Sequence, residues 1–100
     1  MKKAICIGIN NYPGIFNDLK GCVNDALDWS AFLQGLGFET SIMLDSQATQ
    51  QNVKTALQDL ISTTNAGDVA VFTYSGHGTQ VSDRNSDEND RYDEAICLYD

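Results

Sequence analysis

Three short apolar runs in the chain predict three β-strands. The first covers residues 3–9, and its nearly unbroken apolar character is typical of a strand that is covered on both faces. Residues 38–44 also have strand character, and the third run covers residues 69–74, directly after a turn at residues 66–68.

Two stretches between these runs have the periodicity of amphipathic helices. Asn24 or Asp25 suits the N-terminus of the first, and Thr49 can cap the second. The order strand, helix, strand, helix, strand predicts, through right-handed crossovers, an α/β fold with a parallel sheet and helices packed on its faces. The apolar residues at helical spacing are Cys22, Ala26, Trp29, Leu33 and Leu36 in the first helix, and Val53, Leu57, Leu60 and Ile61 in the second.

This topology predicts where a ligand would bind. In open parallel sheets, ligands bind beyond the carboxyl ends of the strands, where the strand order reverses. If the first strand is central, with the second on one side and the third on the other, the segments that follow strands one and three meet there. We therefore expect Cys22, Asp25 and His77 to share one neighbourhood, although they are far apart in the sequence.

His77 is the only histidine of the chain, and it lies between two glycines just after the third apolar run. Histidine is the side chain whose ordinary pKa lies near neutrality, and flanking glycines let the backbone turn sharply and approach a ligand. We expect an exposed imidazole that acts as an acid or base. The alternative is a histidine with a purely structural role.

Length and charge limit the possible classes of protein. One hundred residues make at most one domain with a modest core. The net charge is −8, and seven of the fourteen acidic residues lie in the last eighteen positions, which argues against nucleic-acid binding and favours a divalent metal or a basic peptide. A solvated acidic loop is the alternative. No apolar run approaches the roughly 20 residues of a membrane span, and the start resembles no signal peptide, so we expect a cytoplasmic protein without membrane contact.

The three cysteines match no metal-binding spacing. Cys6 and Cys97 lie in apolar runs, and we expect both to be buried, reduced thiols. Cys22 lies near a predicted helix N-terminus, a position that would lower its pKa.

Four motifs resemble those of one enzyme family. They are Ile7–Asn10, Gly21–Ala26, Tyr74–Thr79 and Asp93–Ile96, and together they look like the first half of the metacaspase-type domain of caspase-like peptidases (peptidase C14), in its bacterial form. The resemblance covers nearly the whole chain. It implies a caspase-like three-layer fold with a mainly parallel sheet and helices on both faces. It also implies a cysteine endopeptidase that cleaves protein or peptide substrates after arginine or lysine through a His/Cys dyad.

The resemblance also implies roles for individual residues. His77 would be the general base, or the imidazolium partner of a thiolate, and the backbone N–H of Gly78 would stabilise the oxyanion of the tetrahedral intermediate. Asp25 would be a buried carboxylate at the base of the S1 pocket, paired with the substrate's guanidinium, and Cys22 would lie beside that pocket. For Asp25, a helix-capping carboxylate is the alternative.

The family's nucleophile is missing from these motifs. In the related caspases the catalytic cysteine follows the histidine by about 50 residues, whereas this chain has 23 residues after His77. Residues 1–100 are therefore expected to be the amino-terminal part of a catalytic domain, truncated before the nucleophile and inactive alone, with the complete domain a monomer. Cys22 is the one resident alternative nucleophile. The other alternative is a catalytically inactive pseudo-enzyme that acts as a binding or scaffold module.

The chemistry requires no cofactor, but metacaspases commonly use calcium as an activator. By that resemblance Asp90 and Asp93 are the leading calcium ligands. The acidic loop also partly matches the spacing of an EF-hand, but Glu88 occupies the position of the required glycine and the flanking helices are missing.

Overall fold

A parallel sheet of three strands, in the order β2-β1-β3, forms the centre of the computed structural model, which describes residues 1–14, 18–82 and 92–100. The first strand is central, which is the condition under which the sequence predicts a site beyond strands one and three. The parallel pairing of both neighbours with β1 confirms the predicted topology. The strands are β1 (Lys2–Gly8), β2 (Glu39–Leu44) and β3 (Val69–Ser75).

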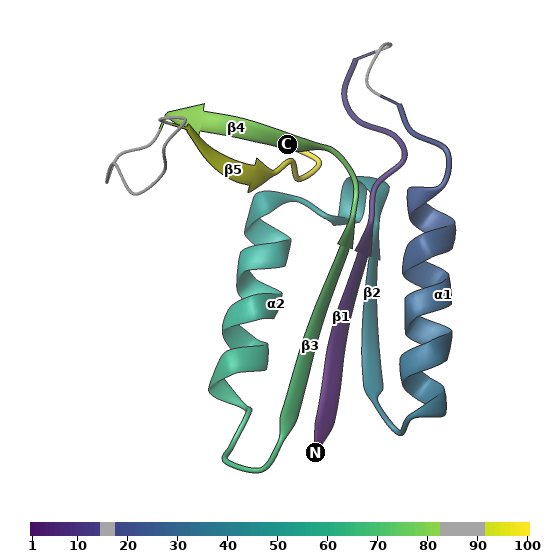
Figure 1. Ribbon diagram of the computed structural model, residues 1–100, viewed down its shortest axis with the longest axis vertical. Coiled ribbons are helices and arrows are strands. Elements are labelled where there is room, and N and C mark those ends of the chain that lie inside the picture. The colour runs from purple at the N-terminus through teal and green to yellow at the C-terminus, as the bar shows by residue number, and fades with distance from the viewer. Residues whose placement is uncertain (15–17, 83–91) are drawn as a thin grey trace.

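Helices α1 (Cys22–Gly35) and α2 (Gln50–Ser62) flank this sheet on opposite sides (Figure 1). The hydroxyl of Thr49 accepts a hydrogen bond from the N–H of Asn52 and caps α2, as predicted. A short 3-10 helix, Asp45–Gln47, connects β2 to the segment before α2. Neither helix, nor any other in the part of the chain that is described, is long and apolar enough to cross a membrane.

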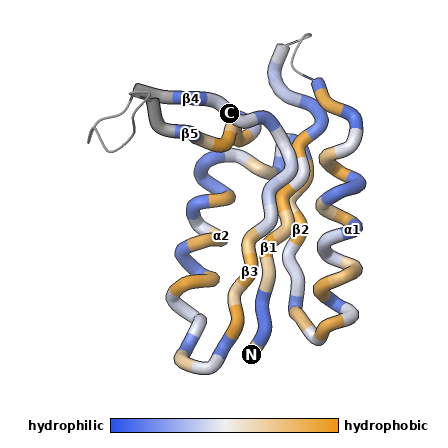
Figure 2. The backbone as a smooth tube through the Cα atoms, in the orientation of Figure 1, coloured by the Kyte–Doolittle hydropathy of each residue, from blue (hydrophilic) through white to orange (hydrophobic). Residues whose placement is uncertain are grey.

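Alternate residues of β1 build the two halves of the core. Successive side chains of a strand point to opposite faces, so a strand between two helices must be apolar throughout. Figure 2 shows hydrophobic residues along the strands, and hydrophobic and hydrophilic residues that alternate along the helices. Ile5, Ile7 and Ile9 pack with Ala48 and Val53 on the α2 side, whereas Ala4 and Cys6 pack with Ala26 and Leu33 of α1.

Gly8, the last residue of β1, touches α1 so closely that no side chain fits. A Cβ atom there would collide with the carbonyl oxygen of Cys22 and lie 2.8 Å from the Cβ of Ala26. We expect Gly8→Ala to lower the free energy of unfolding by about 1–3 kcal/mol, because α1 must move away from the sheet. Urea denaturation measures this loss.

Gly35 offers a matched control for that substitution. It ends α1, and no atom lies within 4 Å of a Cβ built on it. Gly35→Ala should leave stability unchanged or raise it by up to about 1 kcal/mol, since alanine favours the helix. Equal denaturation midpoints for Gly8→Ala and the wild type would show that the contact between β1 and α1 is not tight.

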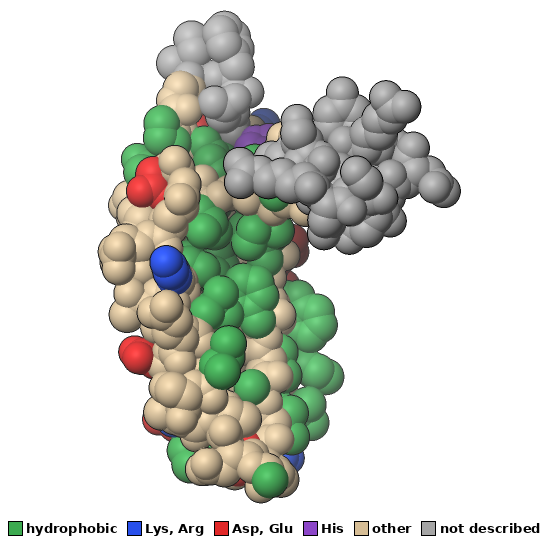
Figure 3. All heavy atoms as spheres, turned by 90° about the vertical axis from the view of Figure 1, so that its left-hand side faces the viewer, with side chains coloured by type: hydrophobic (Ala, Val, Ile, Leu, Met, Phe, Trp, Pro, Cys, Tyr) green, Lys and Arg blue, Asp and Glu red, His purple; other side chains and the backbone are tan. Residues whose placement is uncertain are grey.

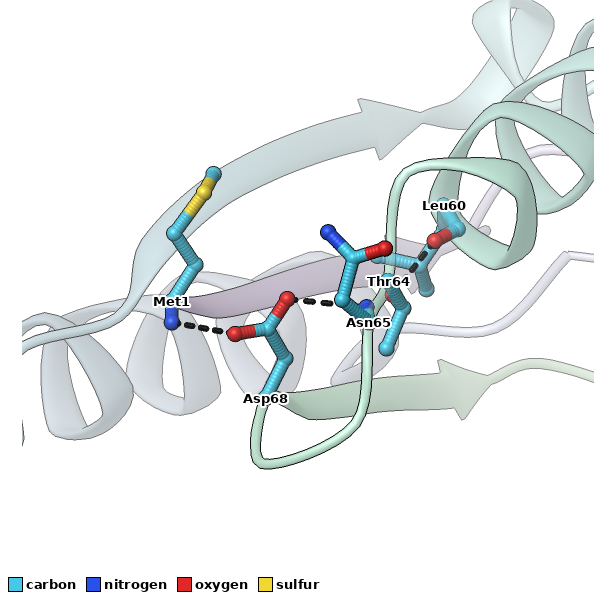
Figure 4. A network of polar contacts seen from close by, with 5 residues as sticks. All are labelled: Met1, Leu60, Thr64, Asn65 and Asp68. Carbon is cyan, nitrogen blue, oxygen red and sulfur yellow. Dashed lines mark hydrogen bonds and ion pairs between the residues drawn. The ribbon is translucent and has the colours of Figure 1, made fainter.

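A polar network fixes the predicted turn between α2 and β3 (Figure 4). The carboxylate of Asp68 accepts hydrogen bonds from the Met1 amino group at 2.6 Å and from the N–H of Asn65 at 2.9 Å. The bond from the amino group holds the pKa of Asp68 below its ordinary value. The hydroxyl of Thr64 donates to the carbonyl of Leu60 at the end of α2. The network therefore ties the start of β1 to the start of β3.

Two antiparallel strands, β4 (Gly78–Ser82) and β5 (Tyr92–Ile96), form a separate small sheet. Figure 1 shows this pair lying across the end of α2. The three strands predicted from the apolar runs do not include this pair. An open hollow on the α2 side has an apolar wall, and Figure 3 shows hydrophobic side chains gathered on this side of the molecule. That wall is formed by Val53, Leu57, Ile61, Ile96 and Leu98.

Candidate active site

The segments that follow β1 and β3 leave the sheet at the same end, as the topology predicts (Figure 1). The N–H of Ile9 donates to the carbonyl of Ser75 at 3.0 Å, so the two strands part only beyond these residues. His77 follows β3, and the segment after β1 leads to Cys22 at the start of α1. The candidate site lies at this end of the sheet.

His77 is half-buried rather than exposed, which corrects the prediction from its glycine neighbours. Its ring centroid lies 4.9 Å from that of Tyr12, with the ring planes tilted by 46°. Its backbone N–H donates to the Tyr12 hydroxyl at 2.9 Å, and its carbonyl accepts from the N–H of Cys97 at 2.9 Å. The residue also borders an open hollow of about 440 Å³. A fixed backbone and an imidazole beside an open space suit a group that transfers protons to a bound molecule.

Gly76 precedes His77 because two tyrosine hydroxyls occupy the space of a side chain. A Cβ atom at Gly76 would lie 2.5 Å from the hydroxyl oxygens of both Tyr12 and Tyr74. Any larger residue would push these hydroxyls away from the backbone of His77. The sequence predicted that this glycine lets the backbone approach a ligand, whereas the groups that approach it in the structure are side chains of the protein itself.

Gly78 begins β4, and the register of the strands fixes the direction of its N–H. Gly78 lies opposite Ile96, and the neighbouring residues His77 and Cys97 are joined by a ladder hydrogen bond. Hydrogen-bonded and non-hydrogen-bonded pairs alternate along an antiparallel ladder. Gly78 therefore belongs to a non-hydrogen-bonded pair, in which the N–H points away from the partner strand.

The start of α1 is capped by a residue from outside the helix. Gly21 occupies the N-cap position and supplies no side-chain bond. The side-chain oxygen of Asn10 accepts instead from the N–H groups of Cys22 at 2.8 Å and Val23 at 3.2 Å. Asn24 and Asp25 lie in the first turn, at the predicted N-terminal end of the helix, and neither occupies the N-cap position. The capping alternative for Asp25 is therefore excluded.

Asp45 holds Asn10 in place. Its carboxylate accepts the backbone N–H groups of Asn10 at 2.8 Å and of Asn11 at 3.0 Å. The φ angle of Asp45 is +49°, in the left-handed region that aspartate tolerates better than most residues. A short polar network thus runs from the end of β2 to the start of α1.

Cys22 and Asp25 share the first turn of α1 but differ in environment. The side chain of Asp25 is exposed, not buried as the resemblance implies, and Cys22 is half-buried. Burial raises the pKa of the Cys22 thiol above its ordinary value, and the carboxylates of Asp25 and Asp45 raise it further. The expected lowering by the helix N-terminus is wrong, because desolvation and two negative charges outweigh the helix dipole.

We expect Cys22 to react slowly with iodoacetamide at neutral pH and faster as the pH rises through its raised pKa, because only the thiolate attacks. Asp25→Asn should speed the reaction by removing one negative charge. Asp59→Asn is the matched control, since Asp59 is exposed on α2 and is not among the groups that shift this pKa. Alkylation rates resolved by peptide mass spectrometry test the prediction, and rapid alkylation of Cys22 at mildly acidic pH would contradict it.

The other two cysteines are also free thiols. Cys6 is fully buried in the core, as predicted. Cys97 is half-buried, which corrects the expectation of full burial. Its backbone carbonyl accepts hydrogen bonds from the hydroxyls of Tyr12 and Tyr74.

The predicted calcium ligands are Asp90 and Asp93. Asp90 lies outside the described residues, and so does the side chain of Asp93, whose backbone pairs with Val81 in the β4–β5 sheet. Within residues 1–14, 18–82 and 92–100, no three His, Cys, Asp or Glu side chains are grouped to hold a metal ion. Calcium binding stays a prediction.

The residues that hold this site together were not predicted. Each of these residues lies at or just after the carboxyl end of a strand of the parallel sheet. This shared position is the feature of the sequence that could have identified them. They are Asn10 and Tyr12 after β1, Asp45 after β2, and Tyr74 at the end of β3.

Comparisons with known proteins agree with the motifs. The profile of the metacaspase, peptidase C14 domain matches residues 2–100. Metacaspase-4 of Arabidopsis thaliana is 38% identical over 105 residues, covering 95% of this chain and 25% of that protein. Metacaspase-1 of Schizosaccharomyces pombe is 40% identical over 105 residues, covering 95% of this chain and 24% of that protein. The chain therefore spans about a quarter of the length of the curated relatives it matches.

The fold is also shared with a solved structure. A crystal structure of a protein from Geobacter sulfurreducens matches 99% of this chain and 39% of its own chain, with a TM-score of 0.86 and 33% sequence identity.

Proposed function

This chain belongs to the metacaspase family of peptidase C14, and from this premise we propose that it carries the histidine half of an active site that cleaves proteins after arginine or lysine. The family is one of caspase-like cysteine peptidases. The observation that carries the proposal is the placement of His77 at the carboxyl end of β3. Its backbone is fixed by hydrogen bonds, and it borders an open hollow.

In the proposed reaction a cysteine thiolate attacks the carbonyl carbon of the substrate's peptide bond. The carbonyl π electrons move onto oxygen, and the N–H of Gly78, which points away from β5, stabilises the resulting oxyanion. The C–N bond then breaks as the His77 imidazolium gives its proton to the departing amine, leaving a thioester. Neutral His77 next takes a proton from the water that attacks the thioester. The acid is released and the thiolate is restored.

We propose that the thiolate lies outside these 100 residues. Cys6 is fully buried, and the pKa of Cys22 is raised. The backbone of Cys97 is bonded into the tyrosine contacts around His77. Cys6 therefore lacks the exposure of a catalytic thiol, and Cys22 lacks its low pKa. We use the term complete domain for a polypeptide that contains this chain together with the nucleophile.

The proposed selectivity for basic residues rests on Asp25, with Cys22 beside it. A carboxylate suits a guanidinium or ammonium group, and arginine can bind it through two parallel hydrogen bonds. An exposed ion pair in water is weak. The substrate and residues outside this chain must therefore shield Asp25 for the pair to select substrates.

Calcium as an activator, with Asp90 and Asp93 as ligands, is also a proposal. It is supported by the crowding of acidic residues before β5. No step of the proposed reaction uses a metal ion.

The experiment that tests the proposed function compares the complete domain with the 100-residue chain on peptides that differ only in arginine, lysine or a neutral residue before the scissile bond. We expect the complete domain to cleave after the basic residues and to be blocked by thiol reagents, and the chain alone to be inactive. A complete domain without turnover would favour a pseudo-enzyme that acts as a binding module. Thiol-dependent turnover by the chain alone, lost in Cys22→Ala, would make Cys22 the nucleophile.

A further inference from the structure

The antiparallel ladder of β4 and β5 continues past the strands to His77 and Cys97. These residues follow in register from the pair Gly78 and Ile96. The N–H of Cys97 donates to the carbonyl of His77 at 2.9 Å, as in a regular ladder. The reciprocal groups, the N–H of His77 and the carbonyl of Cys97, are bridged by a side chain. The hydroxyl of Tyr12 accepts a hydrogen bond from the N–H of His77 at 2.9 Å and donates one to the carbonyl of Cys97 at 2.7 Å.

A second hydroxyl completes this arrangement. Tyr74 donates to the carbonyl of His77 at 2.7 Å, lies 2.9 Å from the hydroxyl oxygen of Tyr12, and also approaches the carbonyl of Cys97. Burial is the main cause that raises the pKa of Tyr74, followed by its hydrogen bond to Tyr12. Tyr74 therefore stays protonated and remains a donor at physiological pH.

Tyr12 restrains both the backbone and the ring of His77. Its ring lies 4.9 Å from the imidazole, while its hydroxyl binds the His77 N–H. The two residues are 65 positions apart in the sequence. The segment after β1 thus reaches across the end of the sheet and supports the loop after β3. A proton-transferring group must be held within a fraction of an ångström of its working position, because a displacement of about 1 Å can cost two orders of magnitude in rate.

We propose that Tyr12 is the positioning residue of His77, with its hydroxyl fixing the histidine backbone and its ring fixing the tilt of the imidazole. This inference rests on the proposed function, since the position of the imidazole affects turnover only if His77 transfers protons. In the proposed reaction Tyr12 forms no bond to the substrate and transfers no proton.

Three substitutions separate the contributions. Tyr12→Phe removes the hydroxyl and keeps the ring, whereas Tyr12→Leu removes both. Tyr99→Phe is the matched control, because Tyr99 contacts Ala48 through its backbone and its hydroxyl makes no bond to His77 among the described contacts. His77 is the only histidine, so isotope-labelled histidine gives a single amide signal in the chain. Hydrogen exchange of that amide reports directly on its bond to Tyr12.

We expect His77 amide exchange to be at least about tenfold faster in Tyr12→Phe and unchanged in Tyr99→Phe. The exchange rate of the Ile7 amide in the central strand, measured in each variant, is used to correct both His77 rates for global unfolding. In the complete domain, Tyr12→Phe should lower kcat by about tenfold, and Tyr12→Leu by more, with little change in KM for an arginyl peptide. A purely structural role would leave kcat per folded molecule unchanged.

Unchanged exchange of the His77 amide in Tyr12→Phe would overturn the inference even if the complete domain is an active peptidase. Unchanged kcat would overturn it as well. An inactive wild-type complete domain would instead overturn the proposed function, and the catalytic use of Tyr12 with it. The exchange rates in the chain would still decide whether Tyr12 holds the histidine backbone.

Discussion

Replacing His77 with alanine is expected to lower kcat of the complete domain on an arginyl peptide by about 10² to 10⁴. The reaction needs one group that protonates the departing amine and then activates water, and an alanine methyl group can do neither. The fold should survive, because the bonds of His77 to Tyr12, Tyr74 and Cys97 all use its backbone atoms. Turnover under saturating substrate, together with hydrogen exchange of the β1 amides, measures both effects.

His77→Gln sharpens the test, because glutamine keeps a polar side chain that can form hydrogen bonds but cannot take up a proton. Its kcat should fall as far as that of the alanine variant. Near wild-type turnover in either folded variant would remove His77 from the mechanism. If both variants lose turnover because they unfold, a purely structural role for His77 would be the better explanation.

Replacing Asp25 with asparagine is expected to reduce kcat/KM for arginyl peptides by about tenfold to a hundredfold. A hydrogen bond to a charged group contributes about 1.5–3 kcal/mol, and the neutral amide loses much of it. Peptides that carry citrulline, a neutral isostere of arginine, should be much less affected. The ratio of kcat/KM for the two peptides therefore measures the contribution of the charge.

Asp59→Asn removes the same charge from α2, on the opposite face of the sheet from α1. In this variant, the ratio of kcat/KM for the arginyl and citrulline peptides should equal that of the wild type. The comparison therefore distinguishes the loss of a local contact from a change in net charge. An unchanged ratio in Asp25→Asn would show that Asp25 does not recognise the basic residue. Because the capping role is excluded by the structure, Asp25 would then be a surface charge.

Much of the fold could be predicted because burial leaves a simple pattern in the sequence. The unbroken apolar run of β1 predicted a strand covered on both faces, and helical spacing identified Val53, Leu57 and Leu60 on the core face of α2. Ile61, predicted on the same face, is exposed. The strands β4 and β5 could not be predicted as a pair, because antiparallel pairing depends on long-range register. Gly78, Thr79 and Gln80 have none of the apolar character that identifies a buried strand.

The candidate site was predicted in position but not in its supporting contacts. A single histidine between glycines after an apolar run was enough to predict that His77 follows a strand of the sheet. The supporting contacts include hydrogen bonds between segments more than 30 positions apart in the sequence, such as those that join Asp45 to Asn10 and Tyr12 to His77. The environment of Cys22 was predicted wrongly, because the helix terminus was visible in the sequence but the carboxylate of Asp45 and the burial of the thiol were not.

The most direct test of the central claim is to trap the nucleophile. The complete domain and its His77→Ala variant are treated with an arginyl acyloxymethyl ketone, which alkylates activated thiols, and the modified residue is identified by peptide mass spectrometry. We expect a single modified cysteine outside residues 1–100, and labelling at least about a hundredfold slower in the variant, because the thiolate depends on His77. A label on Cys22, or equal labelling of the two proteins, would contradict a His77-dependent active site completed by a cysteine outside this chain.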